Sequence, residues 1–84
     1  MTSKTSTSAT RTLRVLSALK GHTITGLSNV EIAKLVGESA VNVTRALATL
    51  VEEGFVIKYD TGRYAHSVKV LQIAQAHFDH VGRM

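Results

Sequence analysis

The sequence predicts a mainly α-helical fold that carries one small β-hairpin, and three observations predict it. Stretches with apolar residues at helical spacing occupy most of the chain. Two of these stretches are separated only by a short Gly-Glu-Ser turn at 37–39. A pair of β-rich runs follows them, around the turn residues 60–62. The chain has 84 residues, so these elements are expected to form one small domain.

The composition narrows the class of protein. Hydrophobic residues make up 44% of the chain and charged residues 19%, which is ordinary for a globular domain and too apolar for a disordered one. The absence of cysteine excludes a disulfide framework and a thiolate zinc site. No apolar run approaches the roughly 20 residues that cross a bilayer, and no signal peptide is recognisable, so we expect no membrane partner and a cytoplasmic location. The net charge of +4 favours a polyanionic partner.

The N-terminal region divides into a polar tail and a helix. Seven of the first ten residues are Ser or Thr, so Met1–Thr7 is expected to be a disordered tail. The helix should begin at Ser8 or Thr10 and end before Gly21, because apolar residues recur there at helical spacing. Its apolar residues are Leu13, Val15, Leu16 and Leu19, with Arg11 and Arg14 on a complementary face that we expect to be solvated.

The segment that follows predicts a brief strand and then a well-delimited helix. β-branched residues alternate in 22–26, which favours a short strand that pairs with later ones. Ser28 and Glu31 form a capping box. The Ser28 side chain accepts from a backbone N–H of the first turn, and the Glu31 side chain reaches back to the backbone N–H of the cap. Gly37 tolerates the left-handed conformation that ends the helix. The residues expected to be buried are Ile32, Leu35 and Val36.

A second Ser-capped helix begins directly after the turn. Ser39 is the predicted N-cap, the helix should extend over 40–53, and Gly54 ends it. Its buried stripe is expected to consist of Val43, Ala46, Leu47, Leu50 and Val51.

The last elements are a hairpin and a helix. The β-rich runs 55–59 and 63–66 flank Asp60-Thr61-Gly62, whose glycine suits a three-residue hairpin loop. Ser67 is a plausible cap for a helix over 68–80.

Helix, short strand, helix, tight turn, helix and hairpin is the order of a winged helix-turn-helix. Within the turn, Ala33 lets two helices cross closely, Gly37 permits the sharp turn, and Val43 packs the second helix onto the first. Such a motif presents its second helix to the major groove of DNA, N-terminal residues first. The winged helix-turn-helix is therefore predicted to span 8–66, with Ser39–Thr49 as the recognition helix.

The DNA-facing flank of the recognition helix should lie opposite its buried stripe. Asn42 can make a bidentate pair with adenine, Val41 can rest against a thymine methyl, and Arg45 is better placed to hold a phosphate. In the hairpin, Lys58 and Arg63 flank the turn and are expected to reach the DNA backbone or minor groove. The predicted DNA contacts are Ser39, Val41, Asn42, Thr44, Arg45, Thr49, Lys58 and Arg63.

The C-terminal segment, 67–84, is predicted to be a dimerisation helix. Leu71, Ala74, Phe78 and Val81 are spaced three, four and three apart, and neighbouring apolar residues widen the stripe beyond what one buried face requires. We favour a homodimer seam over a helix that only covers the domain's own core, because twofold operators reward dimers. Two histidines lie near each other on this helix without a third ligand, so we expect no metal and no other cofactor.

Four stretches carry a resemblance to a known family: RTLRVL at 11–16, EIAKLVG at 31–37, VTRALATLVEEGFV at 43–56 and GRY at 62–64. Over 8–70 the chain resembles the DNA-binding domain of IclR-type bacterial transcriptional regulators, most specifically at 43–56. The resemblance implies a winged-helix fold, dimeric binding to a palindromic operator and control of transcription.

Two departures limit what the resemblance implies. Val41 and Asn42 stand where the family commonly has a Ser-Thr pair, so the family's target sequence does not transfer. The family's C-terminal effector-binding domain does not follow in this sequence. We therefore expect no small-molecule effector, and a small repressor of the phage or mobile-element kind.

Other function classes fit less well. The sequence has no phosphate-cradling glycine pattern and no nucleophile elbow, so we expect no enzyme. The alternative that stays open is a winged-helix adaptor that docks proteins and does not bind DNA. Glu38, Glu52 and Glu53 lie near the recognition helix and keep this alternative open.

Overall fold

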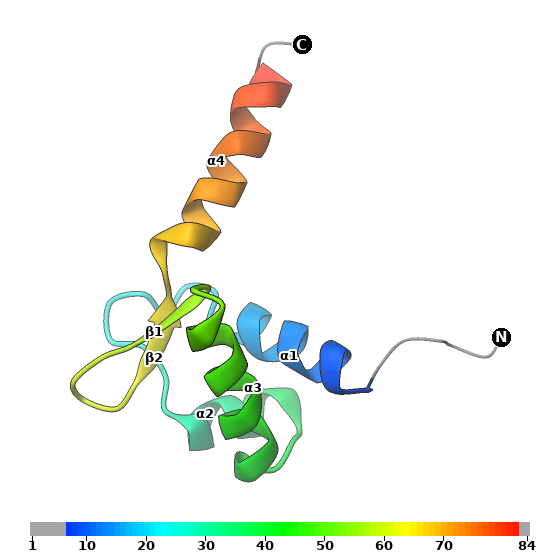
Figure 1. Cartoon of the computed structure of the whole chain (residues 1–84). Coiled ribbons are helices and arrows are strands. Elements are labelled where there is room, and N and C mark those ends of the chain that lie inside the picture. Colours follow the sequence, from blue (N-terminus) through cyan, green and yellow to red (C-terminus); the bar gives the residue numbers. More distant parts are fainter. Residues whose placement is uncertain (1–6, 83–84) are drawn as a thin grey trace, which may run out of the picture.

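The computed structural model describes residues 7–82 of the chain. Three helices and a two-stranded hairpin form the body of the molecule, and a fourth helix leaves it (Figure 1). This arrangement is a winged helix-turn-helix, which confirms the predicted fold class. The elements are α1 (Thr7–Ala18), α2 (Asn29–Val36), α3 (Ala40–Glu52), β1 (Val56–Lys58), β2 (Tyr64–His66) and α4 (Val68–Gly82).

The ends of the first helices follow the local sequence closely. The helix α1 begins at Thr7, one residue before the predicted start, and the rest of the predicted tail lies outside the described residues. The capping box of α2 is present: the Ser28 hydroxyl accepts from the Glu31 N–H, and the Glu31 carboxylate accepts from the Ser28 N–H. Gly37 ends α2 with φ of 70°, the left-handed conformation that the sequence predicted.

The turn and the hairpin position the third helix. Ser39 caps α3, because its hydroxyl accepts from the Asn42 N–H at 3.2 Å. The strands β1 and β2 pair antiparallel, with Ile57 opposite Ala65. Their connection closes through a hydrogen bond from the Tyr59 N–H to the Arg63 carbonyl at 2.7 Å, which leaves 60–62 as the predicted hairpin loop.

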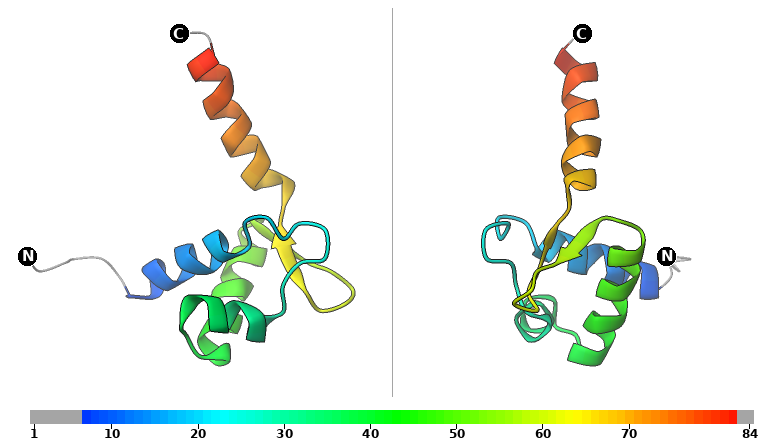
Figure 2. Two further views of the ribbon diagram at one scale, coloured as in Figure 1. Left: turned by 180° about the vertical axis from the view of Figure 1, so that it is seen from behind. Right: turned by 60° about the vertical axis from the view of Figure 1, so that its left-hand side comes forward.

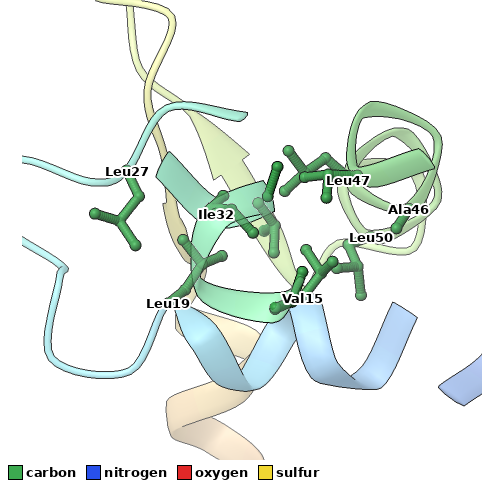
Figure 3. Packing of buried hydrophobic residues seen from close by; sticks show 11 residues of the cluster. Val15, Leu19, Leu27, Ile32, Ala46, Leu47 and Leu50 are labelled. Atoms are coloured by element: carbon green, nitrogen blue, oxygen red, sulfur yellow. The ribbon is translucent and has the colours of Figure 1, made fainter. Parts of the chain in front are cut away.

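Among the described residues, one apolar core joins α1, α2, α3 and β1 (Figure 3). These elements and the turn after α1 contribute side chains with no exposed surface: Val15 from α1, Leu19 directly after it, Ile32 from α2, and Leu47 from α3. Burial of one such side chain contributes about 1.5–3 kcal/mol relative to leaving it in water. This core holds α2 and α3 at a fixed angle, and so leaves the far flank of α3 available to a partner.

The prediction of a strand over 22–26 is wrong. The segment forms turns, and only Leu27, the residue after it, makes an isolated antiparallel bridge with Tyr64. The Gly26 N–H donates to the His22 carbonyl at 2.9 Å, and Gly26 has φ of 71°, so the chain closes on itself instead of extending. Side chains of the hairpin occupy the carbonyls that a strand partner would otherwise satisfy.

Two residues expected in the core are exposed. The Leu35 side chain is 62% exposed and Val51 is 40% exposed. The helix α2 turns the side of Ile32, Ala33 and Val36 toward its neighbours, so Leu35 lies on its outer side. Val51 lies at the edge of the α3 stripe, where it lines a surface hollow with Lys58 and Tyr64.

The helix α4 projects away from the body in every view (Figure 2). None of its residues is buried, so the alternative in which it covers the domain's own core is wrong for this chain by itself. Among the described residues, no helix is long and apolar enough to span a membrane.

Candidate nucleic-acid interface

One flank of α3 is not covered by the rest of the domain. Val43, Ala46, Leu47 and Leu50 face the core. On the opposite side, Val41 is 62% exposed, and Arg45 and Ala48 are also exposed. Within residues 7–82 the Arg45 guanidinium makes no hydrogen bond and no ion pair, which leaves its donors available for an anion.

The hairpin lies beside this flank. A hollow between α3 and the hairpin is lined by Thr44, Ala48, Val51, Glu52, Lys58 and Tyr64. The Lys58 ammonium lies 5.7 Å from the centroid of the Tyr64 ring, so a cation–π contact holds this cation at the edge of the hollow. Two parts of the predicted DNA interface, the exposed side of α3 and Lys58 of the hairpin, therefore lie on one surface.

The hydroxyl groups of α3 are engaged within the domain. Thr44 Oγ1 donates to the Ala40 carbonyl at 2.8 Å and accepts from Asn29 Nδ2 at 3.0 Å. Thr49 Oγ1 donates to the Arg45 carbonyl at 3.4 Å. Ser39 uses an oxygen lone pair for its cap and keeps its own O–H as a donor.

Asn42 lies on the α1 side of α3 and is half-buried. Its Nδ2 donates to Glu38 Oε1 at 3.4 Å, and the same oxygen forms an ion pair with Arg11 Nε at 2.9 Å. This chain of contacts joins α1, the turn and α3. One amide hydrogen of Asn42 is thereby occupied, while its second amide hydrogen and its carbonyl oxygen stay available.

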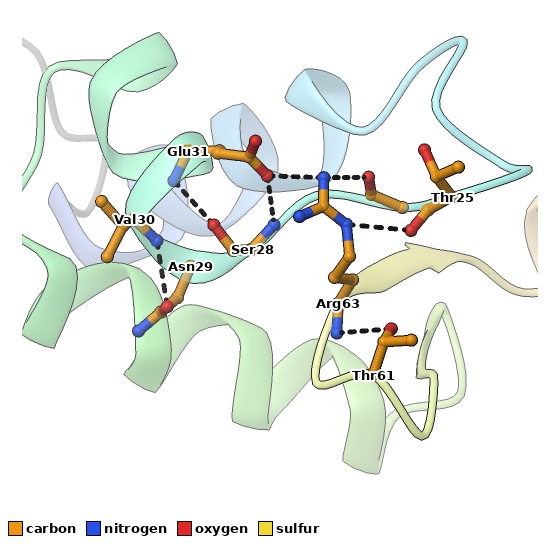
Figure 4. A network of polar contacts seen from close by, with 8 residues as sticks. Thr25, Ser28, Asn29, Val30, Glu31, Thr61 and Arg63 are labelled. Atoms are coloured by element: carbon orange, nitrogen blue, oxygen red, sulfur yellow. Dashed lines mark hydrogen bonds and ion pairs between the residues drawn. The ribbon is translucent and has the colours of Figure 1, made fainter.

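Arg63 is held against the domain by three acceptors (Figure 4). Its Nε donates to the Thr25 carbonyl and its Nη2 to the Gly26 carbonyl, each at 3.1 Å. The Nη2 atom also lies 2.7 Å from Glu31 Oε1. The arginine predicted to reach DNA therefore also fastens the hairpin to the loop before α2 and to the α2 cap.

The same network sets the protonation of the capping carboxylate. The hydrogen bond from the Ser28 N–H lowers the pKa of Glu31 below its ordinary value of 4.5, and the charge of Arg63 adds to the effect. Glu31 therefore stays ionised to a lower pH than an ordinary glutamate, and the ionised carboxylate is the form that pairs with Arg63 and accepts from the Ser28 N–H.

The expectation that Arg11 and Arg14 form a solvated face is correct only for Arg14, which is exposed although it also makes a hydrogen bond to the domain. Arg11 pairs with Glu38 and its side chain is 22% exposed, and Arg14 Nη2 donates to the Val36 carbonyl at 2.9 Å. Both arginines reach the turn because α1 packs across the helix-turn-helix. The Val36 carbonyl belongs to the last turn of α2, where a cation is electrostatically favoured.

The predicted dimerisation residues are exposed along α4, with Leu71 63% and Phe78 68% exposed. Sequence reasoning missed several residues that organise the surface. Glu38 was noted only as a nearby acid, and Asn29 was not singled out. Their partners Arg11 and Thr44 lie 27 and 15 positions away, so no local spacing signalled these contacts.

The geometry agrees with the comparisons with known proteins. The sequence model of the IclR helix-turn-helix domain matches residues 8–58. The chain belongs to the IclR helix-turn-helix family. The family consists of DNA-binding domains of transcriptional regulators. Because these domains are not enzymes, the match confirms the expectation that the chain is no enzyme.

Solved structures of IclR proteins superpose well on this chain. An IclR-family transcriptional regulator from Brucella abortus is 27% identical with a TM-score of 0.79 over 90% of this chain. HmgR of Pseudomonas aeruginosa is 27% identical with a TM-score of 0.76 over 87%. IclR of Thermotoga maritima, at 22% identity and a TM-score of 0.68 over 84% of this chain, shares the fold.

The IclR domain seen here spans 29%, 31% and 28% of the length of those three chains. Comparison with curated protein sequences returns no match. The expectation of a small repressor without a small-molecule effector stays a prediction.

Proposed function

We propose that this IclR-type domain binds double-stranded DNA sequence-specifically as a homodimer and represses transcription in the cytoplasm. The observation that carries the proposal is the uncovered flank of α3, where Val41 is exposed and the Arg45 guanidinium has no partner among residues 7–82. An α-helix fits the major groove, whose width is about 12 Å. The flank supplies an apolar contact, Val41, at the end of the helix that enters first, and a phosphate-binding cation, Arg45, one turn further along.

The hairpin beside α3 supports the same orientation. Lys58 lies at the edge of the hollow between the two elements, so a DNA strand that passes there meets a cation on the hairpin, while Arg45 lies on the α1 side of the helix. Thr44, Ser39 and Thr49 border the flank: the Ser39 O–H stays available as a donor, and the Thr44 and Thr49 oxygens can each accept a further hydrogen bond. Arg63 can offer DNA only its remaining N–H donors, because its Nε and Nη2 atoms hold the hairpin against the Thr25 and Gly26 carbonyls.

Asn42 is the proposed base-reading residue. Glu38 occupies one hydrogen of its amide, which leaves one donor and one acceptor available. Adenine presents one acceptor and one donor in the major groove, whereas guanine presents two acceptors. The arrangement therefore favours adenine over guanine at the position that Asn42 reaches.

The α4 helix supports the dimer. Leu71, Ala74, Phe78 and Val81 form a stripe at coiled-coil spacing on a helix with no buried residue. A helix this apolar gains stability when a second copy covers the stripe. Two copies would present two α3 helices to successive major grooves.

Selection of bound duplexes from a random pool tests the proposal. We expect enrichment of a twofold-symmetric sequence. With Asn42→Ala, affinity for that sequence should fall by about 1–3 kcal/mol while binding to unrelated duplexes hardly changes. A pool without enrichment, or an equal loss on all sequences, would contradict base recognition by α3.

A further inference from the structure

The direction of α4 is fixed at its first turn alone. Every residue from Leu71 to the end of the helix is exposed, so packing against the body does not hold it. The ribbon leaves the body at the corner between α3 and β1, close to the C-terminal end of α3 (Figure 1). The contacts at that corner therefore decide where α4 points.

Ser67 makes the first of these contacts. Its N–H donates to the Phe55 carbonyl at 2.9 Å, and its hydroxyl donates to the Gly54 carbonyl. The same hydroxyl accepts from the Lys69 N–H at 3.2 Å, as an N-cap does. The start of α4 is thus hydrogen-bonded to Gly54 and Phe55, the two residues that follow the C-cap of α3.

Lys69 makes the second contact, and it reaches α3 itself. Its Nζ donates to the Glu53 carbonyl at 2.9 Å and lies 4.6 Å from the centroid of the Phe55 ring. Glu53 is the C-cap of α3, where the unpaired carbonyls carry partial negative charge. An ammonium satisfies such a carbonyl and also contacts the aromatic face, so two separate attractions hold one side chain.

We propose that Lys69 is a positioning residue that fixes the angle between the dimerisation helix α4 and the recognition helix α3, and thereby sets the half-site spacing that the dimer accepts. This inference rests on the proposed function. If two copies join through α4, the separation and relative rotation of the two α3 helices depend on this one corner. DNA turns once in about 10.5 base pairs, so a change of two base pairs in spacing rotates one half-site by roughly 70°. A rigid corner therefore rejects altered spacings, and a loose corner tolerates them.

The first test measures duplex binding by Lys69→Met, which keeps a long unbranched side chain and removes the ammonium. The selected half-sites are placed at their best spacing and at spacings two base pairs shorter and longer. We expect the wild type to prefer its best spacing by about tenfold or more, and Lys69→Met to reduce that preference to about threefold or less, at unchanged dimer mass. Equal spacing preferences in the two proteins would overturn the inference.

The matched control is Lys58→Met, since Lys58 is another cation held over an aromatic ring. This substitution removes the same charge from the protein, but Lys58 lies in β1 and not at the α3–α4 corner. We expect it to weaken binding by a similar factor at all spacings and to leave the spacing preference intact. A loss of preference in this variant as large as in Lys69→Met would assign the effect to charge alone and overturn the positioning role.

A second test needs no DNA, so the inference can fail or succeed independently of the proposed function. The chain has no cysteine, so Glu52→Cys on α3 and Gln72→Cys on α4 take spin labels specifically. Dilution with unlabelled protein restricts the measured distances to one protomer. We expect one narrow distance distribution in the wild-type background and a clearly broader one with Lys69→Met. The same width in both backgrounds would show that Lys69 does not set the angle.

Discussion

Cations with similar expected roles differ in how free they are. The Arg45 guanidinium has no partner among residues 7–82, the Lys58 ammonium lies over Tyr64, and the Arg63 guanidinium is held by two carbonyls and a carboxylate. A free cation on the flank of α3 adds to DNA affinity without any change of the fold. A bound one has a structural role that must be separated from its effect on DNA.

Arg45→Ala tests the free cation. The substitution should weaken binding to all duplexes by a similar factor, and reduce the slope of log affinity against log salt by about one unit, because one phosphate contact is lost. Fluorescence anisotropy titrations at several salt concentrations measure both effects. Lys20→Ala removes the same charge from an exposed position after α1 and serves as the control. Identical slopes for the two variants would remove Arg45 from the interface.

Glu31 gives the stability a defined pH dependence. Its pKa in the folded protein is lowered below 4.5, chiefly by the hydrogen bond from the Ser28 N–H. A lowered carboxyl pKa stabilises the fold above the unfolded value, and this contribution disappears as the pH falls through the folded pKa. We expect Glu31→Gln to have a lower Tm than the wild type near pH 7, and the two Tm values to approach each other as the pH falls below 4.5 and through the lowered pKa. A Tm difference that is constant from pH 7 to pH 3 would contradict this assignment.

At the scale of elements, the sequence predicted what neighbouring residues decide. The caps at Ser28 and Ser39 and the left-handed Gly37 depend on residues within one helical turn, and all three were predicted. The failed strand at 22–26 depends on side chains more than 30 positions away: Tyr59 binds the Thr23 carbonyl, and Arg63 binds the Thr25 carbonyl. The contact of Asn42 with Glu38 was within reach of sequence reasoning, at helical spacing, but the ion pair that holds Glu38 was not.

Gly26 is the point at which the loop before α2 meets the hairpin. An added Cβ would lie 2.6 Å from the Tyr64 carbonyl oxygen, and the residue has φ of 71°. Gly26→Ala should therefore destabilise the domain by more than the backbone strain of about 1–3 kcal/mol. The matched variant is Gly21→Ala, which has φ of 82° but no atom within 4 Å of the added Cβ, so it reports the backbone strain alone. Equal losses in chemical denaturation would show that the loop yields and that the close approach carries no cost.

At the scale of the whole molecule, the body and α4 are organised differently. The body has one core that joins three helices and the hairpin, whereas α4 leaves its apolar stripe in solvent. The sequence predicted the stripe correctly as helical, because its periodicity is local. What covers the stripe is a property of the assembly, so the homodimer stays a prediction.

Phe78→Glu tests the seam. A carboxylate placed in an apolar contact must be desolvated without a partner, so the dimer should dissociate at concentrations at which the wild type is dimeric. Sedimentation velocity gives the mass of each protein. Gln72→Glu adds the same charge on the opposite side of α4 and should leave the mass unchanged. If the Phe78→Glu protein stays dimeric, the dimer interface does not include Phe78.

The central claim is that the uncovered flank of α3 and the hairpin beside it bind the sugar-phosphate backbone and the major groove. The most direct measurement is the affinity for a duplex as a function of salt concentration. The account predicts a straight line of log affinity against log salt, with a slope of about −0.9 for each phosphate neutralised and several phosphates for each dimer. An affinity that does not change with salt would contradict the claim and favour a winged-helix adaptor that docks proteins.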